Sequence, residues 1–343
     1  MNEKERLLPT PKSVTGALMM PTIAKFVLIL SLICGPVLYG KEKVDFSKLT
    51  SPIIFRGDHK YGFRDPAVVY HDGNFYLYFT LSEAATDGGY YNMTAYSKSG
   101  DLVQWTFPEI ITARDRNLNY SSPGNIIRYK DEWIICLQTY PTPNREMFGT
   151  KDSRIWIMRS RNLKDWSEAE LLLVKGNHVP REEMGRMIDP YLLADAQEKG
   201  KWWCFYKQNG ASMSYSYDLK NWTYVGHTRA GENVTVIRQS KEYVMFHSPS
   251  NGIGVKRSKD LKSWGKDAQL LTLGQKQWPW AQGRLTAATV INLMEEPAVG
   301  KYIMFFHGSS KAGLQIQRAH GAASLAIAWS DDLVNWIWPG KDR

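Results

Sequence analysis

The chain has 343 residues, of which 43% are hydrophobic, 22% charged and 13% aromatic. This balance can bury a large core, which excludes a wholly disordered chain, a collagen and a disulfide-rich miniprotein. The formal net charge is +9 at pH 7, but no dense basic run accompanies it, so no nucleic-acid partner is expected. Three cysteines, Cys34, Cys136 and Cys204, cannot form a disulfide framework, and no Cys-x-x-Cys pair is present to hold a metal. Cys136 and Cys204 lie in apolar strand-like runs, where a buried thiol is expected.

The first forty residues form a segment that differs from the rest of the chain. Residues 26–38 are an apolar run that follows a lysine and ends shortly before the charged Lys41-Glu42-Lys43. A secretory signal has this layout, with an apolar region of about 7–15 residues, whereas a membrane-spanning helix needs about 20. We therefore expect residues 1–40 to be a signal peptide with its upstream segment. The mature chain would be secreted or periplasmic and would not contact the membrane after cleavage.

Two features of this segment leave alternatives open. The stretch before residue 19 is largely polar and unlike the start of a signal, so translation from Met19 or Met20 is an alternative to translation from Met1. An uncleaved membrane anchor and a lipid anchor at Cys34 are the alternatives to a cleaved signal.

An internal repeat organises the remaining residues, 41–343. The pattern Ser-x-Asp/Asn-Leu-x-x-Trp occurs five times, and its tryptophans are separated by 61, 56, 42 and 72 residues. They are Trp105, Trp166, Trp222, Trp264 and Trp336. The Ser and Asp/Asn side chains can hydrogen-bond nearby backbone amides and form a tight turn between two strands. The Leu and Trp supply apolar mass that packs one unit against the next, so the repeat is a supersecondary unit with variable loops.

Each copy of the pattern follows two strand-like runs joined by a short polar turn. The five pairs of runs are residues 65–80, 122–139, 189–207, 232–248 and 286–309. A third run leads into each Ser-x-Asp turn and a fourth follows it, and no segment shows sustained helical periodicity. Four antiparallel strands repeated five times predict an all-β fold, a single five-bladed β-propeller. Since each copy carries its strands in the same chain order, we expect the ring to close without a strand from the other terminus.

Short motifs precede or begin the first strands of three repeats. They are Arg64-Asp65-Pro66, Ile188-Asp189-Pro190 and Gly231-Glu232. In these motifs the chain resembles the five-bladed propeller glycoside hydrolases, in particular family 43 and the related families 32, 62 and 68. The resemblance implies that Asp65 is the general base, Glu232 the general acid, and Asp189 the residue that tunes and orients the acid.

The geometry of a propeller leads to the same three carboxylates. The innermost strands line a central channel, so equivalent positions of successive blades face one another across it. Aligning the repeats predicts one ring made of Asp65, Ser122, Asp189, Glu232 and, approximately, Thr286. Three carboxylates in one ring repel one another and oppose folding. Glycosidic cleavage needs them, because one carboxylic acid protonates the leaving oxygen and one carboxylate acts as base or nucleophile. A third carboxylate nearby keeps such an acid protonated near neutral pH.

Further candidates for contact with the substrate lie where the second strands return to the same face. These positions are Thr80, Gln138, Lys207, His247 and His307, and each side chain can hydrogen-bond a sugar hydroxyl. Ser122 shares the predicted ring. We expect Arg64 and Arg284 to pair with the carboxylates, and Trp280, with its neighbour Trp278, to stack on a sugar face. For the two histidines and the two tryptophans, a purely structural role is the alternative.

We therefore expect a glycoside hydrolase that cleaves an oligo- or polysaccharide, of the arabinofuranoside, xyloside or galactoside type. One alternative is a carbohydrate-binding propeller without catalysis, because Asn233-Val234 follows Glu232 where the family commonly has Gly-Pro. Another is a retaining fructan-active hydrolase with Asp65 as the nucleophile. No metal site and no cofactor are expected, while a structural calcium ion in the channel and the oligomeric state are left open.

Overall fold

The computed structural model describes residues 43–316 and 321–341. The predicted signal segment, Cys34 and the alternative start sites lie outside the described residues. Within the described part, the helical elements are three 3-10 turns, Phe46–Lys48, Arg181–Glu183 and Gly313–Gln315. No helix in these ranges has the length and apolarity needed to cross a membrane.

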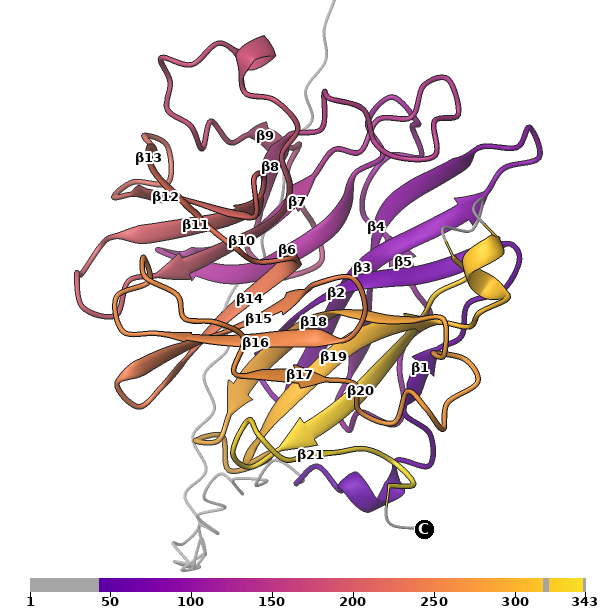
Figure 1. Ribbon diagram of the computed structural model, residues 1–343. Coiled ribbons are helices and arrows are strands. Elements are labelled where there is room, and N and C mark those ends of the chain that lie inside the picture. The colour runs from indigo at the N-terminus through magenta and orange to yellow at the C-terminus, as the bar shows by residue number, and fades with distance from the viewer. Residues whose placement is uncertain (1–42, 317–320, 342–343) are drawn as a thin grey trace, which may run out of the picture. The chain divides into compact units, whose positions relative to one another are not determined.

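Within residues 43–316 and 321–341 the strands form five antiparallel sheets, and each sheet is one blade (Figure 1). Blade 1 consists of β2 (Tyr61–His71), β3 (Asn74–Ala84), β4 (Tyr90–Ser99) and β5 (Glu109–Ile110). Blade 2 consists of β6 (Ser121–Tyr129), β7 (Glu132–Gln138), β8 (Ile155–Ser160) and β9 (Glu170–Leu171). Blade 3 consists of β10 (Ile188–Ala194), β11 (Trp202–Lys207), β12 (Ala211–Ser216) and β13 (Thr223–Thr228). Blade 4 consists of β14 (Glu232–Gln239), β15 (Glu242–Ser248), β16 (Ile253–Ser258) and β17 (Gln269–Leu271). Blade 5 consists of β18 (Arg284–Leu293), β19 (Lys301–Ser309), β20 (Ser324–Ser330), β21 (Trp336–Ile337) and β1 (Ile53–Phe55).

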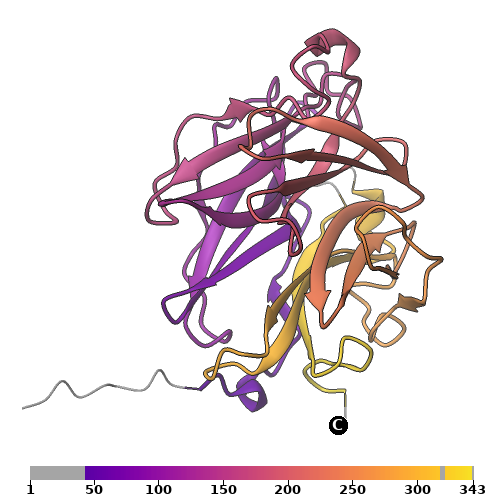
Figure 2. The same cartoon turned by 90° about the vertical axis from the view of Figure 1, so that its left-hand side faces the viewer.

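The first strands of the five blades surround the central channel. Each of them contacts the first strand of the next blade, from β2 through β6, β10 and β14 to β18, and β18 contacts β2 again. In Figure 2 the colours accordingly run around the ring in chain order. The prediction of an all-β propeller with five four-stranded blades is confirmed.

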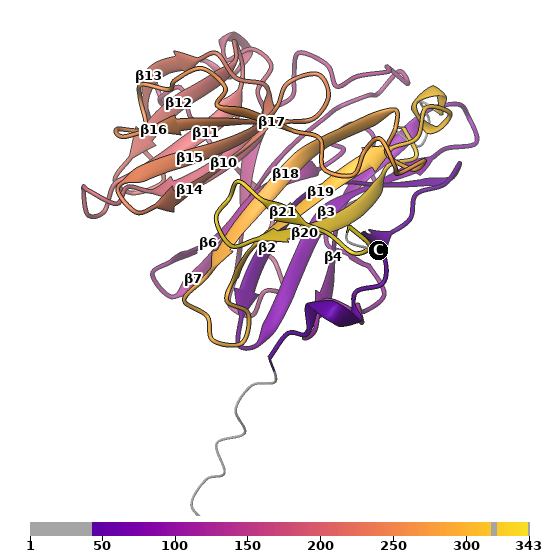
Figure 3. The ribbon, with the colours of Figure 1, turned by 60° about the horizontal axis from the view of Figure 1, so that its bottom comes forward.

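The closure of the ring differs from the prediction. β1, at the start of the described chain, pairs with β20 of the last blade, with Ile53 opposite Ala326 and Phe55 opposite Leu325. The expectation that no strand is borrowed from the other terminus was therefore wrong. The physical reason is that β21 has two residues and pairs only with Trp329 and Ser330, which leaves most of the edge of β20 for another strand to cover. Figure 3 shows β18, β19 and β20 beside β2 and β3, where blade 5 meets blade 1.

The repeated Ser-x-Asp/Asn-Leu-x-x-Trp pattern forms the same turn in every blade. In blade 1, Ser99 Oγ accepts a hydrogen bond from the Leu102 N–H (2.9 Å), and Asp101 Oδ1 accepts one from the Gln104 N–H (2.8 Å). Leu102 has a left-handed φ of 67° and a buried side chain, and Trp105 Nε1 donates to its carbonyl oxygen (2.9 Å). The same φ region is adopted by the other four leucines, Leu163, Leu219, Leu261 and Leu333. The five tryptophans therefore lie at equivalent blade positions, as predicted.

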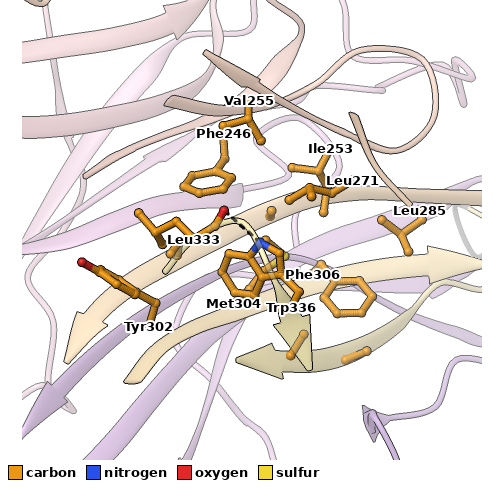
Figure 4. Close-up of a cluster of buried hydrophobic side chains, with 14 of the residues drawn as sticks. Phe246, Ile253, Val255, Leu271, Leu285, Tyr302, Met304, Phe306, Leu333 and Trp336 are labelled. Atoms are coloured by element: carbon orange, nitrogen blue, oxygen red, sulfur yellow. Dashed lines mark hydrogen bonds between the residues drawn. The ribbon is translucent and has the colours of Figure 1, made fainter. Parts of the chain in front are cut away.

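The hydrophobic core is divided into clusters that lie between neighbouring blades. Figure 4 shows one of them, in which Phe246 and Val255 of blade 4 face Met304 and Trp336 of blade 5. Burying side chains of this size stabilises the fold by about 1.5–3 kcal/mol each. Cys136 and Cys204 are buried as free thiols in another cluster, as expected. The blades are thus fixed to one another by packing, which gives the channel-lining residues a rigid frame.

Candidate active site

The first strand of each blade bends near its start at one residue with a left-handed φ. The five residues are Asp65 (47°), Ser122 (40°), Asp189 (51°), Asn233 (49°) and Ala287 (54°). At each of them the register between the first and second strands shifts, as at a β-bulge, which re-aims a side chain. All five line one small hollow in the channel, so we call them the bulge ring. Left-handed φ values at residues other than glycine cost about 1–2 kcal/mol each, and such strain gathers at functional sites.

The bulge ring differs from the predicted ring in blades 4 and 5. Asn233 occupies the place that was assigned to Glu232, and Ala287 the place assigned to Thr286. Glu232 and Thr286 each precede a bulge by one residue, as Arg64 does in blade 1. The alignment was wrong by one residue because blades 4 and 5 lack the residue-proline pair that marks the bulge in the other three blades.

Hydrogen bonds from each blade to the next hold the bulge ring in place. The donor is a bulge N–H. The acceptor belongs to the second strand of the preceding blade, where it pairs with the residue just before that blade's own bulge. The four bonds are Ser122 N–H to Thr80 Oγ1 (2.7 Å), Asp189 N–H to Gln138 Oε1 (2.7 Å), Ala287 N–H to Ser248 Oγ (2.8 Å) and Asp65 N–H to His307 Nδ1 (3.1 Å). Lys207 takes the corresponding place in blade 3, and its ammonium group has no acceptor to offer. Three of the five candidates predicted at the ends of the second strands, Thr80, Gln138 and His307, thus position the bulge ring.

His247 lies one residue before the acceptor position of its blade, which Ser248 takes. Its Nδ1 accepts a hydrogen bond from the Gly231 N–H (3.0 Å), and its Nε2 lies 2.7 Å from Asp267 Oδ1. Burial lowers the pKa of His247, while the hydrogen bond to Asp267 opposes this shift. Because both ring nitrogens are engaged by the protein, the contacts favour the structural role that was the alternative for His247.

A cavity of about 420 Å³ lies over the bulge ring. Seven of its lining residues were predicted: Arg64, Asp65, Ser122, Gln138, Asp189, Glu232 and Arg284. Seven others were not: Asn92, Ser121, Tyr140, Phe148, Arg186, Ile188 and Asn233. The cavity therefore brings all three predicted carboxyl groups together, and their catalytic roles stay predictions.

Asp65 is held on the floor of this cavity by neutral donors. Its side chain is buried, and its Oδ2 accepts hydrogen bonds from Thr80 Oγ1 (3.2 Å) and Ser122 Oγ (3.1 Å). Its Oδ1 accepts a longer bond from Asn233 Nδ2 (3.4 Å). Because the backbone N–H of Asp65 is also bonded, to His307, its carboxylate is fixed in orientation as a nucleophile or base requires.

Asp189 is the carboxyl group whose protonation the site changes most clearly. Burial raises the pKa of Asp189 to about 8, and the negative charges of Glu232 and Asp65 act in the same direction. A hydrogen bond from Ser122 and the positive charge of Arg186 oppose the shift. Asp189 therefore carries a proton at neutral pH and can act as a hydrogen-bond donor.

Glu232 is the most exposed of the three carboxyl groups. Its side chain is 39% exposed, and its Oε2 lies 3.9 Å from Arg284 Nη2. This distance is at the limit of an ion pair, so the expected pairing of Arg284 with a carboxylate is loose. An exposed carboxyl group without tight partners is free to follow a leaving group in the cavity.

His307 lies beneath the cavity floor and does not line the cavity. Burial lowers the pKa of His307 well below its usual value, and the positive charges of Arg64 and Arg284 lower it further. The ring is therefore neutral, and its Nδ1 serves as acceptor for the Asp65 N–H, so its proton lies on Nε2. The contacts make His307 a positioning residue for Asp65.

The two predicted stacking tryptophans pack against each other in the loop between β17 and β18. The ring centroids of Trp278 and Trp280 are 5.2 Å apart, and both rings stack on Phe306. Trp280 is not among the residues that line the cavity, so the packing favours its structural alternative. The aromatic side chains that line the cavity are instead those of Tyr140 and Phe148, and Phe148 is 61% exposed.

Arg186 is the charged lining residue that the sequence analysis missed. It precedes the bulge residue Asp189 by three positions, as Arg284 precedes Ala287. Arg186 could have been predicted from this spacing, because an arginine lies three residues before the bulge in both blade 3 and blade 5. Arg186 Nε donates to the carbonyl oxygen of Gly149 (3.2 Å), and its guanidinium lies 5.4 Å from the ring centre of Tyr140. Among the described residues, no cluster of His, Cys, Asp or Glu is arranged to hold a metal ion.

Comparison with known families identifies one match within the propeller. The sequence model of the glycosyl hydrolases family 32 N-terminal domain matches residues 65–239, which are 175 of the 343 residues. This stretch includes Asp65, Asp189 and Glu232. A search of curated protein sequences found no significant match.

Solved structures share the fold at low sequence identity. The Coprinopsis cinerea GH62 α-L-arabinofuranosidase catalytic domain aligns with a TM-score of 0.57 at 14% identity, over 83% of this chain and 97% of that one. An exo-1,5-α-L-arabinanase from a bovine ruminal metagenomic library aligns with a TM-score of 0.55 at 19% identity, over 80% and 95%. The Cellvibrio cellulosa α-L-arabinanase complexed with arabinohexaose aligns with a TM-score of 0.58 at 16% identity, over 79% and 92%. The fold therefore recurs in proteins that span about the same length.

Proposed function

The chain belongs to the glycosyl hydrolases of family 32 through their N-terminal domain, and we propose that it hydrolyses a glycosidic bond with Asp65, Asp189 and Glu232. The observation that carries this proposal is the presence of all three carboxyl groups on one cavity over the bulge ring. Hydrolysis of a glycosidic bond needs a carboxylic acid and a carboxylate on two sides of the bond. The two buried aspartates on the floor and the more exposed glutamate at the side supply such a set.

The surroundings of each carboxyl group support a different role. Asp65 is fixed by neutral donors, which suits the base or the nucleophile. Glu232 is exposed to the cavity, which suits the general acid that must reach the leaving oxygen. Asp189 holds a proton below them, and in this form it orients its neighbours without adding a third negative charge.

The substrate that we propose is an oligo- or polysaccharide of the arabinofuranoside, xyloside or galactoside type. Two structural neighbours are named as an arabinofuranosidase and an arabinanase, and one was solved with arabinohexaose. Ser122 and Gln138 line the cavity with groups that can hydrogen-bond sugar hydroxyls, and Phe148 offers an aromatic face to a sugar ring.

The proposed enzyme acts outside the cytoplasm. This part of the proposal depends on the apolar run at residues 26–38 and the charged residues that follow it. Sequencing the N-terminus of the protein recovered from its native cell should give a start near residue 41. Recovery of residues 1–40 intact on soluble cytoplasmic protein would contradict export.

A substrate screen tests the proposed chemistry directly. The purified chain from residue 41 would be incubated with arabinan, xylan, galactan and fructan and with aryl glycosides of the same sugars. Released sugars would be quantified, with Asp65→Asn as the matched inactive control. We expect release by the wild type alone. Binding of an oligosaccharide in the cavity without any release would favour the carbohydrate-binding alternative.

A further inference from the structure

Three arginines surround the cavity at its walls. Arg64 precedes the bulge of blade 1, while Arg186 and Arg284 lie three residues before the bulges of blades 3 and 5. Arg64 and Arg284 are close enough that the charge of Arg64 lowers the pKa of Arg284, after the larger effect of burial. Holding like charges in a partly buried cavity costs free energy. A negative charge held beside these guanidinium groups would offset this cost.

The protein's own carboxylates do not pair tightly with these guanidinium groups. Among the described residues, no carboxylate oxygen lies within ion-pair distance of Arg64, and Arg284 reaches Glu232 only at 3.9 Å. The Nε atoms of Arg64 and Arg284 are both buried without a hydrogen-bond partner. Asp65, the carboxylate next to Arg64 in the chain, accepts its hydrogen bonds from Thr80, Ser122 and Asn233 instead. No carboxylate of the described residues therefore neutralises either guanidinium group at close range.

The charges that face the cavity do not cancel. Since burial raises the pKa of Asp189 to about 8, no more than two of the three carboxyl groups can be negatively charged at neutral pH, whereas three guanidinium groups line the same cavity. A neutral sugar would leave this excess positive charge without a partner. A carboxylate or a sulfate group is the ligand that matches it, because a guanidinium binds such groups through two parallel hydrogen bonds.

We infer that the sugar held in this cavity carries an anionic group, a carboxylate or a sulfate ester, which Arg64 and Arg284 bind directly while Arg186 contributes its charge from the opposite wall. This inference rests on the proposed function and narrows its substrate class to acidic glycans. Arg186 is fixed by Gly149 and Tyr140, so its charge is held in place before a ligand arrives.

Binding of matched sugars tests the inference independently of catalysis. Calorimetry on the wild type would compare galacturonate with galactose, glucuronate with glucose, and galactose 6-sulfate with galactose. We expect the anionic member of at least one pair to bind at least about 10-fold more tightly, since hydrogen bonds to charged groups contribute about 1.5–3 kcal/mol. The preferred pair identifies whether a carboxylate or a sulfate is the natural group. Equal binding, or no binding, of both members in every pair would overturn the inference.

Arginine variants localise the effect. Arg64→Gln and Arg284→Gln should each weaken binding of the anionic sugar by about 10- to 100-fold and weaken binding of the matched neutral sugar much less. Arg64→Lys should restore part of the affinity, because it keeps the charge and loses the paired donors. Arg161→Gln is the matched control, since Arg161 is exposed in the turn after β8 and its loss should change nothing. Anionic binding that survives Arg64→Gln and Arg284→Gln would contradict the assigned site.

A hydrolysis experiment separates this inference from the proposed function. An acidic polysaccharide would be compared with the same polysaccharide after reduction of its carboxyl groups to alcohols, or after removal of its sulfates. Faster cleavage of the acidic form supports both proposals. Equal cleavage of both forms leaves the hydrolase standing and overturns the anionic substrate. Tight anion binding without cleavage of any glycan would support the anionic ligand and overturn the proposed hydrolase.

Discussion

At the scale of single residues, Asp65 and Glu232 differ in how firmly the protein holds them. Asp65 is buried, has three side-chain hydrogen bonds and stands on a backbone with a left-handed φ. Glu232 is 39% exposed and has one loose ionic contact. A group that attacks a fixed carbon must be held in position, whereas a proton donor must reach leaving groups of different shapes.

The acid and the base should therefore respond differently to the leaving group. Glu232→Gln keeps the size of the side chain and removes the transferable proton, so it should lose about 10²–10⁴-fold in kcat/KM on a natural glycan. Aryl glycosides with acidic leaving groups need less protonation and should lose much less. Asp65→Asn should be nearly inactive on both kinds of substrate. The measurement is a comparison of kcat/KM for the three proteins, and full activity of Glu232→Gln on the glycan would exclude Glu232 as the acid.

The raised pKa of Asp189 predicts that the stability of the folded protein depends on pH. Its pKa is about 8 in the folded protein and about 3.9 in an unfolded chain. Between these values the folded state binds the additional proton, so stability falls as pH rises from about 4 to about 8. Asp189→Asn removes this penalty and should be more stable than the wild type at pH 8 by at least about 1 kcal/mol, with a smaller gain at pH 4. Denaturant unfolding at both pH values measures the difference.

Asp260 provides a control, because its pKa shift predicts a pH dependence of stability with the opposite sign. Hydrogen bonds from the backbone N–H groups of Ser263 and Lys262 hold the pKa of Asp260 at about 2, with burial opposing. A lowered pKa gives stability that is present above the unfolded value and lost as pH falls through the folded value. Asp260→Asn keeps the turn geometry that Asn162 has in blade 2, so it should lose stability at pH 8 and lose less near pH 3. A gain at pH 8 in both variants would mean that the Asp189 effect is not electrostatic.

At the scale of elements, the strand that closes the ring is short but carries a large aromatic contact. Phe55 of β1 packs against Phe63, Phe79 and Trp105, with ring centroids 5.3–6.4 Å apart. Phe55→Ala should reduce the free energy of unfolding by about 1–3 kcal/mol, below the 3–5 kcal/mol of a fully buried phenylalanine because Phe55 is partly exposed. Denaturant unfolding measures this loss. Phe107→Ala, which removes a side chain that is 89% exposed, should change stability by less than about 0.5 kcal/mol.

The same elements show what the sequence could and could not predict. The turn motif was predictable because its Ser, Asp and Leu each have a local role that chain neighbours determine. The bulges of blades 1 and 3 were predictable because an Asp-Pro pair marks them. No proline follows Asn233, so the alignment assigned the bulge position of blade 4 to Glu232. The pairing of β1 with β20 and the packing of Trp280 depend on residues far away in the chain, which local patterns do not specify.

At the scale of the whole propeller, the seam between blades 5 and 1 passes directly under the site. The bond from the Asp65 N–H to His307 crosses this seam, and so does the approach of Arg64 to Arg284. Segments before β2 fasten the seam from outside, through Val44 N–H to Ala298 O (2.8 Å) and Ile327 N–H to Pro52 O (2.9 Å). The contacts that close the ring therefore also determine the geometry of the candidate site.

Removal of the residues before Asp58 should weaken the contacts between blades 5 and 1 more than the contacts between the other blades. A chain that starts at Asp58 lacks β1 and both of these bonds, so its Tm should fall by at least about 5 °C, since roughly 2–4 °C corresponds to 1 kcal/mol in large domains. Below that Tm, amide hydrogen exchange should be faster in β2, β18 and β20, while β10 to β12 of blade 3 should exchange as in the chain that starts at residue 41. The value of kcat should fall as well, because His307 no longer holds Asp65 in one orientation. Uniformly faster exchange in all five blades would show instead that the ring opens only as a whole, and the seam would have no separate influence on the site.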